Sequence, residues 1–264
     1  MTLLYGVVHL LPLPGSPRWG GSLQAVLDAA LADAEALAEG GADGIVIENF
    51  HDAPFRPERV DAVTVAAMTR AALAIRAQVA LPQMINVLRN DAAAALGIAV
   101  AVGAEAIRIN VHTGVMVTDQ GLLRGNADET LRLRRLLSAE QVQIVADVLV
   151  KHAVPLSTAL LEDAVHDVVE RGLADAVIIT GSATGQATNA DEVRRAHAAA
   201  QGRPVWVGSG VTPEHAAALA PYTHGVIVGT WLKQNRDVHA AVDARRVRQL
   251  RSALDVASST RGSR

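Results

Sequence analysis

The chain of 264 residues contains no cysteine, few aromatic residues and no long hydrophobic run. Without cysteine it forms neither disulfides nor thiolate metal sites, which is compatible with a reducing compartment. Aromatic residues make up only 3% and the formal net charge is −3, which argues against a nucleic-acid partner. No run approaches the roughly 18 apolar residues of a transmembrane helix, and the first residues lack the features of a signal peptide. We therefore expect a soluble, cytoplasmic protein.

Eight short runs rich in β-branched residues alternate with helix-like stretches along the chain. This order predicts an α/β fold, a parallel (β/α)8 TIM barrel, since each strand is followed by a helix. Half of the residues are hydrophobic, enough for a large core. The rival is a doubly wound Rossmann-type sheet, but no G-x-G-x-x-G motif follows the first run. The runs are 5–9, 44–48, 83–87, 106–110, 143–148, 176–180, 204–207 and 225–228.

Three segments, 41–47, 103–109 and 172–179, resemble one another, and the first two start 62 residues apart, at residues 41 and 103. That spacing is two units of roughly 31 residues, as expected for stacked βα repeats in a closed barrel. We predict one barrel domain over residues 1–254, followed by a disordered tail over 255–264. The segment 112–125 is predicted to be a loop at the C-terminal end of the strands.

Glycine-rich turns follow the seventh and eighth predicted strands, where barrels commonly bind phosphate. Glycines let the backbone approach an anion closely, and N–H groups at a helix start point toward it. A tight turn before Thr212 and Pro213 would explain the same glycines without any ligand. The predicted phosphate-binding residues are Gly208, Ser209, Gly210, Gly229 and Thr230.

Charged residues at the ends of the second and fifth strands are candidates for catalysis. Asp147 and Lys151 lie on the same face if the fifth strand stays extended, and they could then divide proton transfer between them. A lysine with a lowered pKa could also form a Schiff base. The alternative is a purely structural salt bridge between the two. Glu48 completes the predicted catalytic set.

Other polar residues converge on the same end of the predicted barrel. In the fourth strand Arg108 and Asn110 alternate with aliphatic residues, so they should face the barrel interior. Only one of Glu48 and Asn49 can do so in a regular strand. The predicted substrate-binding residues are His9, Asn49, Asn86, Arg108, Asn110 and Thr180.

Metal binding and membrane binding stay open as weaker alternatives. His9, Glu48, Asp52, His112 and Asp147 could in principle supply ligands, but no H-x-H or H-E-x-x-H spacing is present. We predict no cofactor and no metal site, with a divalent metal as the alternative. The arginine-rich stretch 245–251 predicts a last helix with a solvated basic face; the alternative is peripheral association with an anionic membrane surface.

Several motifs together resemble the BtpA/SgcQ family, over about residues 5–250. The N-terminal motif is Gly-Val-Val-His-Leu-Leu-Pro-Leu-Pro-Gly-Ser-Pro at 6–17, and the others lie at 48–55, 108–111, 118–121, 146–152 and 180–185. Many members have a small residue where this chain has His51. The resemblance implies a barrel of the ribulose-phosphate-binding type. Some members are linked to photosystem I accumulation at the thylakoid membrane; others are labelled nucleosidases or accompany sugar-uptake genes, and the family extends beyond photosynthetic organisms.

Two hypotheses from different classes follow from these observations. The first is an enzyme that acts on a phosphorylated sugar or nucleoside-like substrate by acid–base chemistry, with a small phosphorylated ligand as its partner. The second is a non-catalytic assembly factor of the photosystem-biogenesis type, which would use the barrel as a scaffold. A polar site formed by several strands favours the enzyme. Barrels often self-associate, so a homo-oligomer is compatible with either hypothesis.

Overall fold

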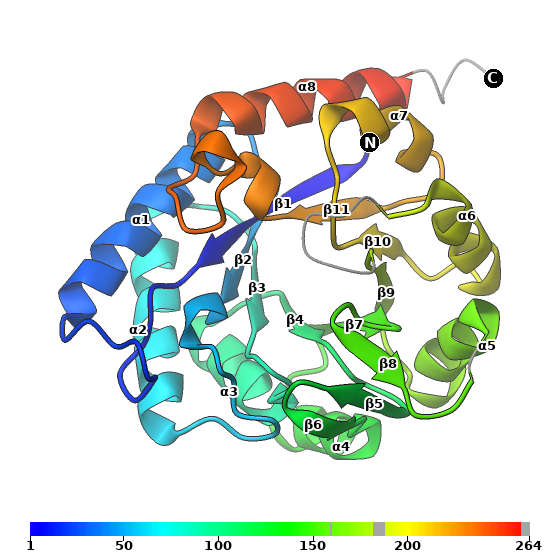
Figure 1. Cartoon of the computed structure of the whole chain (residues 1–264), viewed down its shortest axis with the longest axis horizontal. Coiled ribbons are helices and arrows are strands. Elements are labelled where there is room, and N and C mark those ends of the chain that lie inside the picture. Colours follow the sequence, from blue (N-terminus) through cyan, green and yellow to red (C-terminus); the bar gives the residue numbers. More distant parts are fainter. Residues whose placement is uncertain (159, 182–187, 260–264) are drawn as a thin grey trace.

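The computed structural model describes residues 1–158, 160–181 and 188–259, and these form a closed parallel barrel surrounded by helices (Figure 1). The strand order around the barrel is β1-β11-β10-β9-β7-β4-β3-β2, so each strand pairs with the next barrel strand along the chain. The (β/α)8 fold predicted from the sequence is confirmed. The barrel strands are β1 (Leu3–His9), β2 (Gly44–Glu48), β3 (Gln83–Asn86), β4 (Ala106–Ile109), β7 (Gln143–Val148), β9 (Ala176–Ile179), β10 (Val205–Val207) and β11 (Gly225–Val228).

The helices cover the outside of the barrel, and their ends follow capping chemistry. Ser22 Oγ accepts a hydrogen bond from Ala25 N (3.2 Å), and Asp91 caps the third helix. Gly103 ends that helix with a φ of 72°, a conformation that glycine adopts without strain. The helices are α1 (Leu23–Glu39), α2 (Ala62–Gln78), α3 (Ala92–Val102), α4 (Ala127–Leu136), α5 (Leu161–His166), α6 (Ala190–Ala199), α7 (Pro213–Leu219) and α8 (Ala244–Ser259). Within the described ranges, none of them has the length and apolar character needed to cross a membrane.

The last helix is longer than the sequence predicted, because α8 continues five residues past the expected boundary at residue 254. Arg251 and Asp255 form an ion pair one turn apart (2.8 Å), and Ser258 Oγ accepts a hydrogen bond from Thr2 N (3.2 Å). These contacts fasten residues 255–259 to the barrel, so the predicted tail is corrected there. Residues 260–264 lie outside the described part of the chain.

Two arginines of α8 contact neighbouring elements, whereas Arg245 is exposed beside Asp243. Arg248 pairs with Glu39 (3.0 Å), and the guanidinium of Arg246 lies 4.3 Å from the centre of the Trp231 ring. Cation–π contact and ion pairing both hold the helix in place. These contacts favour the structural interpretation of the arginine-rich stretch.

Part of the predicted loop 112–125 is a hairpin, which corrects that expectation. Strands β5 (Val115–Thr118) and β6 (Gly121–Arg124) pair with each other, and β5 also pairs with β8 (Ala153–Pro155). Gly121, at a φ of 97°, makes the tight turn that joins β5 and β6. The small sheet follows the period of two: Met116 and Leu123 are buried, whereas Val117 and Leu122 are exposed.

The repeated segments of the sequence form the same arrangement three times at the N-terminal end of the barrel strands. We call this end of the barrel the floor. In each repeat, the acidic residue just before a strand accepts a hydrogen bond from a backbone N–H of the preceding barrel strand. The acceptor and donor residues are Asp43 and Leu4 (2.7 Å), Glu105 and Gln83 (2.7 Å), and Asp175 and Ile144 (2.8 Å). Each carboxylate thus fixes one pair of neighbouring strands.

Each floor carboxylate also forms an ion pair with an arginine from a helix. The pairs are Arg251 with Asp43 (2.6 Å), Arg76 with Glu105 (3.1 Å) and Arg134 with Asp175 (2.6 Å). The fourth pair of strands, β10 and β11, uses other groups, because both His224 N and Thr223 Oγ1 donate to the carbonyl of Val205 (2.7 and 3.0 Å). The internal repeat of the sequence therefore serves the closure of the barrel.

Candidate ligand site

The barrel interior changes from apolar to polar along the strands. A buried apolar cluster fills the lower interior, and it includes Val7, Val46, Met84, Val145, Ile178, Trp206 and Ile227. Two positions further along each strand, the inward residue is polar or glycine, as the period of two requires. These upper residues are His9, Glu48, Asn86, Arg108, Asp147, Thr180, Gly208 and Gly229. They form the polar lining at the C-terminal end, the rim, where barrel enzymes have their active sites.

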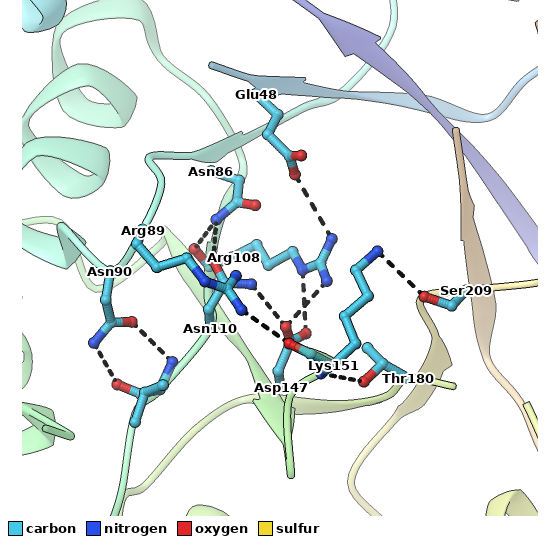
Figure 2. A network of polar contacts seen from close by, with 11 residues as sticks. Glu48, Asn86, Arg89, Asn90, Arg108, Asn110, Asp147, Lys151, Thr180 and Ser209 are labelled. Carbon is cyan, nitrogen blue, oxygen red and sulfur yellow. Dashed lines mark hydrogen bonds and ion pairs between the residues drawn. The ribbon is translucent and has the colours of Figure 1, made fainter. Parts of the chain in front are cut away.

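A buried network joins Arg108, Asp147, Asn110 and Asn86 (Figure 2). Arg108 donates twice to Asp147, from Nε to Oδ1 (3.1 Å) and from Nη2 to Oδ2 (3.0 Å), and Asn110 Nδ2 donates to Oδ2 (2.8 Å). Asn86 Nδ2 in turn donates to Asn110 Oδ1 (3.1 Å). Burial alone would lower the pKa of Arg108, but the charges of Asp147 and Glu48 outweigh it and raise that pKa above its usual value. Asp147 is therefore held by Arg108, and the salt bridge with Lys151 that the sequence left open is absent from the described contacts.

Glu48 is the inward residue at the end of β2, and Asn49 turns away from the barrel interior. The Glu48 carboxylate lies 3.8 Å from Arg108 Nη1, and it lines a cavity at the rim. Asn49 instead ties two rim loops together, because its Oδ1 accepts from Leu88 N (2.8 Å) and its Nδ2 donates to Asp52 Oδ2 (3.0 Å). Of the two neighbouring candidates, Glu48 is thus the one placed to meet a ligand in this cavity.

Lys151 reaches the cavity although β7 does not stay extended to it. The strand ends at Val148, and Leu149 has a φ of 49°, so the chain turns before the lysine. Lys151 N donates to Thr180 Oγ1 (3.1 Å), and Nζ lies 3.3 Å from Ser209 Oγ. No carboxylate among the described residues lies within ion-pair distance of Nζ. Burial, followed by the positive charge of Arg108, lowers the pKa of Lys151 to about 8.

The glycine-rich turns after β10 and β11 border the same cavity, whose volume is about 300 Å³. All five predicted phosphate-binding residues line it, together with Lys151 and Arg236. A Cβ on Gly208 would lie 2.6 Å from Ile178 Cγ2, and one on Gly229 would lie 2.8 Å from His9 Cε1. A side chain at either position would displace one of these neighbours, so glycine fits there best.

His9 borders this cavity as a buried imidazole. Burial, and then the positive charge of Lys233, holds the pKa of His9 well below its usual value, so the ring is neutral near pH 7. Its Nδ1 has no hydrogen-bond partner among the described residues. The ring packs against Phe50, with the two centroids 4.5 Å apart.

A second cavity of about 340 Å³ adjoins the first and shares Glu48, Phe50, Arg108 and Lys151 with it. Its further lining includes residues for which the sequence gave no functional role: Arg18, Phe55, Arg89, Asp119, His152 and His239. Most of them lie several residues beyond a strand, in connections whose course follows from tertiary packing. Arg89 nevertheless comes only three residues after the end of β3. A charged residue so close to a strand end at the rim could have been added to the predicted site.

Four of the five metal-ligand candidates make other polar contacts, and the fifth, His9, packs against Phe50. Within the described ranges, no three histidine or acidic side chains gather as a metal site would require. Glu48 and Asp147 face Arg108, Asp52 Oδ1 accepts a hydrogen bond from Leu13 N (2.8 Å), and His112 Nε2 bonds to the Gly172 carbonyl (2.8 Å). In the turn 180–185, the structure describes residues 180 and 181 only.

The strand order, the location of the two cavities and the charges of their lining residues define a (β/α)8 barrel with a polar and largely cationic site at the C-terminal end of its strands. The model of the BtpA family matches residues 2–256, and the chain belongs to that family. A photosystem I biogenesis protein, BtpA, from Synechocystis sp. is 54% identical over 242 residues, which cover 92% of this chain and 84% of the relative.

Solved structures share the fold at low sequence identity. Thiamine phosphate pyrophosphorylase from Pyrococcus furiosus has a TM-score of 0.58 and 14% identity, covering 97% of this chain and 96% of the other. N-(5'-phosphoribosyl)anthranilate isomerase from the same organism has a TM-score of 0.58 and 13% identity, covering 97% of this chain and 100% of the other. Identities this low show the barrel fold alone.

Proposed function

We propose that the chain is an enzyme that acts on a phosphorylated sugar or nucleoside-like substrate at the C-terminal end of the barrel. The phosphate would lie against the turns after β10 and β11, and the reaction would take place beside Lys151 and Glu48. The observation that carries this proposal is Lys151, a largely buried amine that points to Ser209 with no carboxylate partner in the described structure. Burying a charge without a partner is costly, so a bound anion is the missing counterpart.

Two of the ionisable groups that line the cavity, Lys151 and Glu48, suit proton transfer or nucleophilic attack. Lys151, with a pKa of about 8, is present in both protonation states near neutral pH, which suits an acid–base catalyst. Its neutral amine could also attack a carbonyl carbon. Glu48 lines the same cavity and is the acidic group of the proposed pair.

Asp147 has a different part in this proposal from the one that the sequence suggested. Its two carboxylate oxygens accept three hydrogen bonds from Arg108 and Asn110. It is therefore a positioning residue, which fixes the guanidinium of Arg108 toward the ligand and leaves acid–base work to Lys151 and Glu48.

The names of similar proteins support different parts of the proposal. The two solved barrels above are named for phosphorylated compounds, which agrees with a phosphate at this rim. The name of the 54% identical relative favours the second candidate, a factor in photosystem I biogenesis. An assembly factor would not need a largely buried amine without a partner inside a cavity, so we prefer the enzyme.

The test is a thermal-shift screen with inorganic phosphate, sugar phosphates, nucleosides and nucleotides, with and without divalent metal. A ligand at a hundred times its dissociation constant adds about 2.7 kcal/mol to the free energy of unfolding. The shift should disappear in Gly208→Ala and Lys151→Met, because the first displaces the turn or Ile178 next to it and the second removes the cation. Gly97→Ala is the matched control, since a Cβ there has nothing within 4 Å.

Two results would contradict the proposal. One is the absence of a shift with any phosphorylated compound, which would favour the assembly factor and make a search for protein partners the next step. The other is an equal shift in wild type and in both cavity variants, which would place the ligand elsewhere on the molecule.

A further inference from the structure

The second cavity has a charge pattern of its own, and it points to a second anionic group on the substrate. We infer, on the basis of the proposed function, that the substrate carries a carboxylate in addition to its phosphate, and that Arg89 and Arg18 bind this carboxylate. The substrate class would then be phosphorylated carboxylic acids, such as phosphorylated sugar acids, in preference to neutral phosphorylated sugars.

Arg89 is the main support for this inference. It is only 6% exposed, and the one hydrogen bond of its side chain among the described residues runs from Nη2 to the Lys151 carbonyl (2.9 Å). No carboxylate of the described structure lies within ion-pair distance of it. The other side-chain nitrogens of Arg89 are not among the fully buried atoms that lack a hydrogen-bond partner. The side chain lines the second cavity. A buried guanidinium usually has an acidic partner, and here the open side of the group faces a space that a ligand can fill.

Arg18 adds a second guanidinium from a different loop, after β1. It lines the same cavity and donates from Nη2 to the Ala53 carbonyl (3.3 Å), and it too has no ion-pair partner in the described ranges. Two guanidinium groups from separate loops therefore face one space. Their planar, forked donors match the two oxygens of a carboxylate.

The wall of the second cavity suits a carboxylate better than another phosphate. It has none of the close glycine turns that border the first cavity, and its neutral surface includes Phe50 and Phe55. Burial, followed by the charge of His239, lowers the pKa of His51 to about 4, so this ring adds no positive charge near neutral pH. The carboxylates of Glu48 and Asp119 in the lining add negative charge, which a singly charged group tolerates better than a phosphate dianion.

Lys151 connects the two cavities and sets the spacing between the two anions. Its carbonyl accepts the hydrogen bond from Arg89, while its amine lies at Ser209 in the phosphate turn (Figure 2). The two anion sites are thus separated by one lysine residue and its two hydrogen bonds. A substrate that spans them places its middle carbons beside Nζ and Glu48.

The experiment compares ligands that differ only in the carboxylate. Binding is measured by calorimetry for phosphogluconate against sorbitol phosphate, and for phosphoglycerate against glycerol phosphate. The wild-type protein should bind at least one acid about tenfold or more tightly than its matched alcohol, the ratio expected for a charged hydrogen bond. Arg89→Met should remove this preference and keep binding of the alcohol phosphate, and Arg18→Met should reduce the preference.

Arg56→Met is the matched control, because this exposed arginine pairs with Asp61 and lines neither cavity. It should keep the full preference. Since Arg18 is exposed, its variant reports on the carboxylate even if Arg89→Met disturbs the loop. Equal affinity for acid and alcohol in both pairs would overturn the carboxylate inference and leave the proposed function standing. Failure of every phosphorylated compound and of inorganic phosphate to bind would refute the proposed function itself.

Discussion

The floor of the barrel and its rim differ in how their charged side chains are paired. At the floor, Asp43, Glu105 and Asp175 each hold an arginine and a backbone N–H, so every one of these charges has its partners within the chain. At the rim, Lys151 and Arg89 lie in cavities with no acidic partner among the described residues. The floor pairs therefore contribute to stability, whereas Lys151 and Arg89 at the rim are the charges that the proposed anionic ligand would pair with.

The chain has only two lysines, Lys151 and Lys233. They show the same contrast, because only one of them pairs with a carboxylate among the described residues. Lys233 is 2% exposed and its Nζ pairs with Asp33 (2.5 Å), while Asp33 also accepts a hydrogen bond from Val242 N (2.8 Å). This pair holds the segment after β11, which supplies Gly229 and Thr230 to the cavity. A buried lysine and a partly buried one thus serve the same site: Lys233 is paired and supports the turn, and Lys151, which has no acidic partner among the described residues, is the proposed reactive group.

The largest effect is expected from breaking the paired lysine. Lys233→Met leaves the Asp33 carboxylate buried without its cation, and it should lower the free energy of unfolding by about 3–5 kcal/mol. Urea denaturation of the purified variant measures this loss. The double variant Lys233→Met/Asp33→Leu should recover much of it, because no isolated charge remains. A loss below about 1 kcal/mol in the single variant would show that the pair is not a structural support.

A smaller loss is expected from removing one carboxylate at the floor. Asp175→Ala leaves Arg134 and the Ile144 N–H without their acceptor, and it should cost about 1–3 kcal/mol in urea denaturation. Asp128→Ala is the control, since it removes an exposed ion pair with Arg132 within one helix, for which about 0.3–0.5 kcal/mol is expected. Equal costs in the two variants would mean that the floor carboxylates add nothing beyond ordinary surface pairs.

The smallest effect on stability is expected at Lys151. Its replacement should leave the stability unchanged or increase it, unlike the two substitutions above. Lys151→Met removes a partly buried charge that has no acidic partner among the described residues, so at pH 7 the free energy of unfolding should stay unchanged or rise by up to about 1 kcal/mol. The same variant should lose the phosphate-dependent thermal shift. A clear loss of stability would show that the amine has an acidic partner within the protein.

The wild-type protein should also gain stability relative to Lys151→Met as the pH rises from about 8 to 10.5. Between the folded pKa of about 8 and the ordinary value of 10.5, the unfolded lysine holds a proton that the folded one has released. The unfolded state binds more protons there, so the free energy of unfolding rises with pH. Phosphate binding should weaken over the same range, because Lys151 loses its charge. With only two lysines, NMR of the reductively methylated protein can titrate Lys151 directly; a pKa near 10.5 would contradict both expectations.

Much of the architecture could be predicted from the sequence, because strand alternation and helix capping are local. The period of two placed Arg108 and Asn110 inside the barrel, and the position of the glycine turns in the chain placed Gly208 and Gly229 at one cavity. The partners of these residues depend on contacts between strands. Arg108 pairs with Asp147 from the next barrel strand, and the salt bridge between Asp147 and Lys151 that the sequence left open as an alternative is not among the described contacts. The hairpin after β4 and the inward course of Arg89 and Arg236 depend on loop packing, which no local pattern reports.

The carboxylates at the floor also bear on the chemistry at the other end of the barrel. Each one fixes how two strands are aligned, and a shift of one residue would turn every inward side chain of a strand outward. With such a shift in β7, Asp147 would face the helices and Val148 would face the ligand. Asp43, Glu105 and Asp175, which touch no ligand, therefore decide which residues a ligand meets.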